Sequence, residues 1–172
     1  MTFYVENETG EDLPFDVEGT VELVCEAVLK AEDCPYEVQV NVVLTDDEGI
    51  RELNRECRGI DRATDVLSFP GLEFRQAGVF RVEHGREADA FDPDTGELML
   101  GDVMLSTDRV RMQAAEYGHS LRREFAFLVA HSMFHLCGYD HETEPEARIM
   151  EEKQEKVLEG LGITREGSGE NE

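Results

Sequence analysis

Three histidines near the end of the chain have the types and spacing of a metal site. They stand in the stretch HSMFHLCGYDH, as His131, His135 and His141. Residues four apart in a helix project from one face, so the first two imidazoles can reach the same ion. Gly138 can end the helix in a left-handed turn and bring His141 back as a third ligand. Three neutral imidazoles with a fourth position open are typical of catalytic zinc, so we predict one Zn²⁺ per chain.

The chemistry that such a site supports is hydrolysis. Bound zinc lowers the pKa of a water molecule from about 16 to about 7 and polarises a carbonyl or phosphoryl oxygen. In zinc proteases with this spacing, a glutamate follows the first histidine and accepts the proton of the water. Ser132 occupies that position here and cannot act as that base. We therefore expect a metal-dependent hydrolase that does not cleave peptides by the standard route.

The general base is not identified by the motif. Asp140, next to His141, is a candidate catalytic residue that could accept a proton or the N–H group of a ligating histidine. The alternative is that Asp140 only forms the turn. A metal-bound hydroxide, or a hydroxyl group of the substrate acting as nucleophile, is also open, and the latter would need a base of its own.

A row of arginines is conspicuous in this acidic chain. Arg51, Arg55, Arg58 and Arg62 are spaced four, three and four residues apart, as along one side of a helix. For Arg51 and Arg55 we expect exposed ion pairs with neighbouring glutamates, each worth about 0.5 kcal/mol or less. Arg58 closely precedes the strand-like stretch TDVLSFP, and for this arginine a functional contribution is favoured over a surface ion pair.

The elements that must position these residues alternate along the chain. Apolar periodicity and capping signals predict strands over 3–7, 36–45, 64–70 and 97–106, and helices over 15–33, 46–57, 108–118, 121–137 and 146–162. This alternation predicts an α+β fold. The metal site would lie on the long helix 121–137 and the turn that follows it.

Local signals refine this arrangement. Thr45 with Glu48, and Thr143 with Glu146, have the spacing of capping boxes that begin the helices 46–57 and 146–162. Residues 71–96 lose periodicity and gather glycine and acidic side chains, so we expect a surface excursion there. Pro70 before it indicates a strand end or an edge strand.

Bulk composition suggests one domain over 1–163 and a flexible acidic tail over 164–172. The N-terminus lacks a leader pattern and no stretch is long and apolar enough to span a membrane, so we expect a cytoplasmic protein. Asp and Glu number 40 against 16 Lys and Arg, for a net charge of -24. Taken alone, this charge argues against a nucleic acid partner.

Four stretches together resemble the YbeY family of bacterial rRNA maturation factors, which are metal-dependent single-strand endoribonucleases. They are LNRECRGIDRATDVLSFP, LGDVMLS, RREFAFLVAHSMFHLCGYDH and EARIMEEKQEKVLEGLG. The resemblance implies a zincin-like mixed β-sheet packed with helices. It also implies that His131, His135 and His141 are the metal ligands and that Arg58 acts on RNA phosphate.

The same resemblance implies a function in 16S rRNA 3′-end maturation and ribosome quality control. The partners would be the single-stranded 16S rRNA precursor and the small ribosomal subunit with its proteins; no DNA partner is expected. Two departures affect the shape of the cleft: Ser132 and Phe134 replace the family's usual glycine and leucine, and the 71–96 excursion is longer and more acidic than usual.

Two other functions compete with this one. A metalloprotease-like hydrolase would use the same histidines but needs the glutamate that Ser132 replaces. A non-catalytic ribosome assembly factor would use zinc to stabilise its fold and its acidic surface to bind basic ribosomal proteins.

Overall fold

The computed structural model describes residues 1–164. The predicted tail lies outside the described residues except for its first residue, Thr164. The strands are β1 Thr2–Asn7, β2 Val38–Thr45, β3 Val66–Pro70 and β4 Leu98–Ser106. The helices are α1 Val17–Ala31, α2 Asp47–Arg58, α3 Glu87–Ala90, α4 Thr107–Tyr117, α5 Leu121–Leu136 and α6 Glu144–Gly160.

The four strands form one mixed sheet in the order β1-β2-β4-β3. Strands β1, β2 and β4 are parallel to one another, and β3 pairs antiparallel with β4 at the edge of the sheet. Pro70 ends this edge strand, where its missing N–H group costs no ladder hydrogen bond. The predicted α+β fold with a mixed sheet is therefore confirmed.

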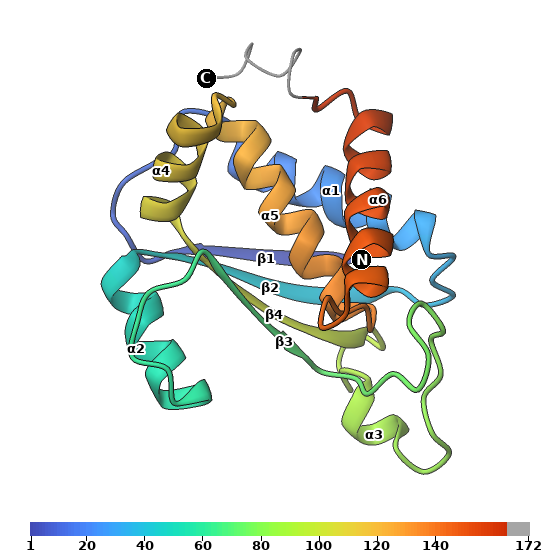
Figure 1. The fold of residues 1–172 in the computed structure, drawn as a ribbon. Helices are drawn as coiled ribbons and strands as arrows, with labels where there is room; N and C mark the ends of the chain where they lie inside the picture. The colour runs from blue at the N-terminus through green and yellow to red at the C-terminus, as the bar shows by residue number, and fades with distance from the viewer. Residues whose placement is uncertain (165–172) are drawn as a thin grey trace.

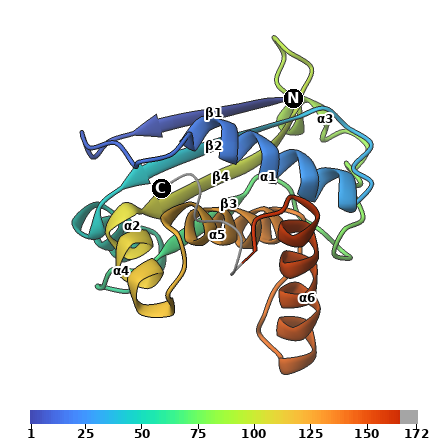
Figure 2. The same cartoon turned by 90° about the horizontal axis from the view of Figure 1, so that it is seen from above.

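Most of the helices cover one face of the sheet. α1, α4, α5 and α6 lie on that face, whereas α2 and the short α3 lie on the other side near opposite ends of the strands (Figure 1). Seen from above, α1 and α5 run over the sheet and α6 packs beside them (Figure 2). Among residues 1–164 no helix combines the length and apolar character needed to cross a membrane.

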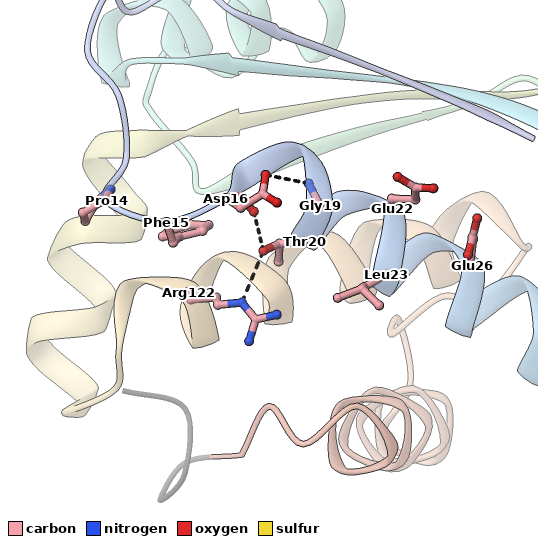
Figure 3. Close-up of a pocket in the computed structure, with 9 residues that line it drawn as sticks. All are labelled: Pro14, Phe15, Asp16, Gly19, Thr20, Glu22, Leu23, Glu26 and Arg122. Atoms are coloured by element: carbon pink, nitrogen blue, oxygen red, sulfur yellow. Dashed lines mark hydrogen bonds between the residues drawn. The ribbon is translucent and has the colours of Figure 1, made fainter. Parts of the chain in front are cut away.

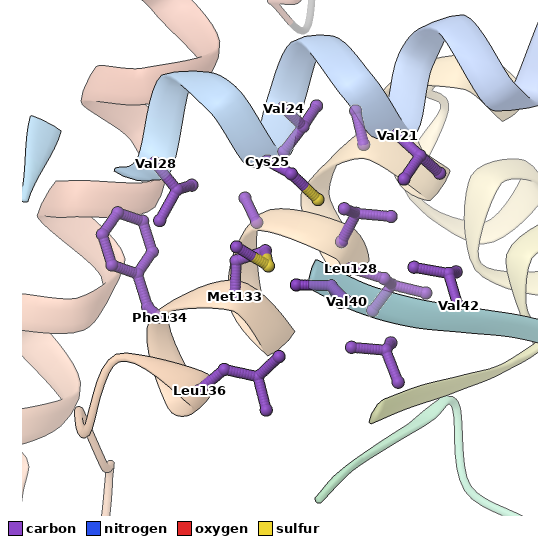
Figure 4. Packing of buried hydrophobic residues seen from close by; sticks show 14 of the residues in the cluster. Val21, Val24, Cys25, Val28, Val40, Val42, Leu128, Met133, Phe134 and Leu136 are labelled. Carbon is purple, nitrogen blue, oxygen red and sulfur yellow. The ribbon is translucent and has the colours of Figure 1, made fainter. Parts of the chain in front are cut away.

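The core lies between α1, α5 and the sheet. Figure 4 shows Val24 and Val28 of α1 facing Met133 and Phe134 of α5, with Val40 of β2 beneath them. Helix α5 is buried on nearly all sides, as expected for a helix sandwiched between a sheet and other helices. Such packing holds the helix that carries two of the three histidines.

The helix ends agree with the sequence signals in all but one case. Thr143 is the N-cap of α6, and its hydroxyl group accepts a hydrogen bond from the backbone N–H group of Glu146 at 3.3 Å. The capping box predicted at Thr45 is wrong, because the N-cap of α2 is Asp46, whose carboxylate accepts a hydrogen bond from the N–H group of Gly49 at 2.8 Å. Aspartate is the stronger cap, and Thr45 is the last residue of β2.

A glycine inside β4 provides the first prediction. Gly101 has φ +149°, and a Cβ atom there would lie 2.4 Å from the carbonyl oxygen of Phe69 and 2.8 Å from a methyl group of Leu136. Gly101→Ala should therefore lower the free energy of unfolding by about 3 kcal/mol, as measured by urea titration. Gly118→Ala is the control, since it shares the positive φ but meets no atom within 4 Å. Equal losses in the two variants would contradict the collision.

Candidate metal centre and cleft

The structure brings the three predicted histidines together. His131 and His135 lie one turn apart on α5, and His141 lies in the loop before α6. One nitrogen from each imidazole lies within 4.8 Å of the others. The first two side chains are half-buried and His141 is exposed. This arrangement is a tripod of imidazoles with one side facing solvent.

A tight reversal after α5 makes the third imidazole available. Gly138 has φ +95°, and its N–H group donates to the carbonyl of His135 at 3.0 Å, while that of Tyr139 donates to Phe134 at 3.0 Å. A Cβ atom at residue 138 would lie 2.6 Å from Phe74. Glycine is therefore required here both for the left-handed conformation and for the close approach of the excursion.

The hydrogen bonds of the imidazoles indicate which nitrogens could bind a metal. Nδ1 of His135 lies 2.9 Å from the carbonyl oxygen of Tyr139, so this nitrogen must carry the proton. Nδ1 of His131 lies 3.4 Å from Oε1 of Gln154, which also accepts only. Both Nε2 atoms are then unprotonated, and they face each other at 3.2 Å. Two lone pairs this close repel unless a cation lies beside them, so the residues fit a metal ion such as zinc.

The protonation of these side chains suits metal binding. Burial, and next the nearby His135, lower the pKa of His131 to about 4. Burial also lowers the pKa of His135. Metal ligands must be unprotonated, so both imidazoles are ready to coordinate at neutral pH.

The tripod lies in a cleft of about 880 Å³ between β3, the end of α2, the start of the excursion and the loop after α5. Its lining includes Arg58, Asp65, Ser68, Leu72, Phe74 and Asp140. The excursion 71–96 thus forms part of the cleft wall through its first residues.

Arg58 is the arginine of the predicted row that lines this cleft. It is exposed at the end of α2, and within residues 1–164 its guanidinium group makes no ion pair. By contrast, Arg51 pairs with Asp61 at 2.9 Å rather than with a neighbouring glutamate, so that detail of the prediction is wrong. Asp61 comes within reach because the chain turns back after α2 at Gly59, which has φ +70°.

Three carboxylates line the cleft, those of Asp65, Asp140 and Glu142. Asp140 is exposed, and its Oδ1 accepts a hydrogen bond from the backbone N–H group of His141 at 2.8 Å. This contact agrees with the alternative that Asp140 forms the turn. Asp65 was missed: it precedes β3, and its oxygens accept from the N–H group of Val66 at 2.8 Å and from Gln113 at 3.4 Å. The only available signal was its position in TDVLSFP, which we assigned to a strand.

A second hollow, of about 730 Å³, lies between the start of α1 and the start of α5 (Figure 3). Its lining holds no histidine or cysteine, and three of its polar residues, Asp16, Thr20 and Arg122, are joined by hydrogen bonds. Asp16 caps α1 by accepting from Gly19 at 3.0 Å, and Arg122 donates to Thr20 at 3.3 Å (Figure 3). These contacts are structural, so we place the candidate site in the histidine cleft.

Comparison with known proteins agrees with this geometry. The family described as Endoribonuclease YbeY matches residues 4–162. Proteins named Endoribonuclease YbeY from Agathobacter rectalis and Lachnoclostridium phytofermentans are 53% and 50% identical over 96% of this chain and 100% of their own length. A solution structure of a Thermotoga maritima protein is similar with a TM-score of 0.53 and 26% identity, covering 92% of this chain and 91% of that one. The chain therefore belongs to the endoribonuclease YbeY family.

Proposed function

We propose that this chain is a zinc-dependent endoribonuclease that cleaves single-stranded RNA. The observation that carries the proposal is the tripod of His131, His135 and His141 in one cleft with the guanidinium group of Arg58, which forms no ion pair within residues 1–164. The proposal includes 16S rRNA 3′-end maturation and ribosome quality control in the cytoplasm, and it treats residues 1–163 as one domain. Membership of the endoribonuclease YbeY family supports the RNA substrate.

Each part of the cleft has a chemical task in this proposal. A zinc ion held by the three imidazoles would supply Lewis acidity and lower the pKa of a water molecule. Arg58 can donate two hydrogen bonds to a phosphate and stabilise the charge that grows on its oxygens. Asp65, Asp140 and Glu142 are the carboxylates that line the cleft and can hold or pass a proton.

The charge of the chain constrains how the RNA arrives. With a net charge of -24, the surface offers little general attraction for phosphate. We therefore propose that rRNA is presented by the small ribosomal subunit, whose basic proteins would bind the acidic surface of this chain. Local contacts such as that of Arg58 would then act on RNA that is already held in place.

The protease alternative loses support from the position of Ser132. Its side chain is fully buried within α5, and its hydroxyl group has no hydrogen-bond partner within the described residues. It does not face the cleft, so it cannot replace the missing glutamate of a zinc protease. The assembly-factor alternative is not favoured by the tripod either, because structural zinc sites are usually closed by four protein ligands.

Substrate choice and chelation test the proposal. We expect purified protein to cleave single-stranded RNA but not duplex RNA or casein, and to lose this activity in EDTA. Activity should return when zinc is added in excess of the chelator. Cleavage of casein at a rate comparable with RNA would support the protease, and RNA cleavage that persists in EDTA would contradict a metal-dependent enzyme.

A further inference from the structure

We infer that α6 orients the metal ligands through two consecutive residues, Gln154 and Lys153, which act as positioning residues. Gln154 holds the ring of His131 directly, and Lys153 holds His135 through Tyr139. The inference rests on the proposed metal site and extends it to an element that contributes no ligand. It predicts that the affinity for the metal depends on the packing of α6 against α5 and the loop that follows α5.

The first contact comes from Gln154. This side chain is buried, and its Oε1 lies 3.4 Å from Nδ1 of His131. An acceptor at this place keeps the proton on Nδ1 and leaves Nε2 free for a metal. The amide nitrogen of Gln154 has no hydrogen-bond partner among the described residues. The hydrogen bond between Oε1 and His131 is therefore the side-chain contact that offsets the burial of this amide.

The second contact passes through Tyr139. Its carbonyl oxygen accepts from Nδ1 of His135 at 2.9 Å, so the position of this backbone sets the direction of the imidazole. The Tyr139 ring is held by Lys153, whose ammonium group lies 5.0 Å from the ring centroid. Lys153 in turn contacts Oε2 of Glu32 at 2.9 Å, and the Glu32 side chain is only 3% exposed. An ion pair between the half-buried Lys153 and the buried Glu32 thus helps to fix the loop that carries the acceptor.

The surrounding packing leaves this loop little freedom. Gly78 of the excursion donates its N–H group to the carbonyl of Cys137 at 2.9 Å. A Cβ atom on Gly78 would lie 2.7 Å from the Tyr139 hydroxyl group and 2.8 Å from Oε1 of Glu32. The excursion therefore covers the Glu32 carboxylate and the Tyr139 hydroxyl group, while Lys153 reaches them from the half-exposed side.

Three neighbouring residues of α6 anchor it at three places. Lys153 bonds to Glu32, the residue after α1, and Gln154 bonds to His131 of α5, while Glu155 accepts from the buried Arg123 at 3.0 Å. The positions of lysine are also informative, because the chain has lysine only at residues 30, 153 and 156. A compact ammonium group fits between the carboxylate and the aromatic ring, whereas a planar guanidinium group is larger and has other bonding directions.

Zinc affinity provides the test of this inference. Outer residues that orient ligands typically contribute about 10- to 100-fold to metal affinity. Gln154→Met and Lys153→Met should each raise the zinc dissociation constant by about that factor, as measured by competition with a chromophoric chelator. Lys156→Met, an exposed change on the same helix, should leave it unchanged.

Further variants separate positioning from a merely structural contribution. Gln154→Glu keeps an acceptor facing His131 and should bind zinc at least as tightly as the original chain. Lys153→Arg keeps the charge but not the shape and should behave like Lys153→Met. The visible spectrum of the cobalt-substituted protein should change in the weakened variants, while circular dichroism of the metal-free proteins shows that they are folded.

The outcomes distinguish this inference from the proposed function. Zinc affinities of folded Gln154→Met and Lys153→Met equal to that of the original chain would overturn the inference alone. Loss of affinity in Gln154→Glu as large as in Gln154→Met would also overturn it, because the acceptor would then not matter. If the original chain does not bind zinc, the proposed function fails first.

Discussion

His135→Ala is expected to abolish zinc binding at micromolar metal and to slow cleavage of single-stranded RNA by about 10³-fold. The estimate corresponds to about 4 kcal/mol of transition-state stabilisation, in the range that a metal ion supplies. The ring of His135 is half-buried, and its Nε2 faces that of His131 at 3.2 Å. The substitution therefore removes one of the three imidazoles that would hold the metal. Zinc content by elemental analysis and initial cleavage rates provide the measurement.

The control for this variant is His84→Ala. His84 is fully exposed on the excursion, and its ion-pair contact is with Glu87 at 3.7 Å. It should keep the zinc content and the cleavage rate of the original chain. A folded His135→Ala protein that still cleaves RNA at a normal rate would contradict the assigned site.

Arg58→Ala is expected to lower kcat for RNA cleavage by about 10²-fold while zinc content stays unchanged. The reason is that Arg58 lies in the cleft, forms no ion pair with the part of the chain that the structure describes, and can stabilise charge that grows on the phosphate in the transition state. Arg58→Lys should recover only part of the loss, because an ammonium group cannot form the two-pronged contact of a guanidinium group. Single-turnover kinetics at saturating RNA separates kcat from binding.

Arg55→Ala is the matched control for Arg58. Arg55 lies almost one turn earlier on the exposed side of α2, and its nearest ion-pair contact is with Glu56 at 4.0 Å. It does not line the cleft, so kcat should stay within about twofold of the original value. An equal loss of kcat in both variants would show that Arg58 contributes only to the general charge of α2.

The gathering of the three histidines was predictable because it is encoded locally. His131 and His135 are four residues apart on a helix, and the reversal at Gly138 follows within three residues. Local geometry therefore places the imidazoles before any tertiary contact is known. The fold class was predictable for a similar reason, since each strand and long helix has its own periodicity.

The contacts around the site could not be predicted in this way. Gln154 reaches His131 across 23 residues of sequence, and the Lys153 contact with Glu32 spans 121 residues. Asp65 enters the cleft only because β3 lies beside α5 in the folded chain. Periodicity describes which face of an element is buried, but not which side chain of another element meets it.

The error at Thr45 has a related cause. A capping box and an aspartate cap differ by one residue, and the end of β2 decides between them. The pairing of Arg51 with Asp61 likewise depends on the turn after α2 rather than on the spacing within the helix.

Zinc titration of metal-free protein tests the central claim most directly. RNA cleavage should be absent without metal, rise in proportion to added zinc and level off at one zinc per chain, whereas His135→Ala should show no rise. Cleavage by the metal-free protein at the full rate, or an equal response of His135→Ala to zinc, would contradict a metal centre built from His131, His135 and His141.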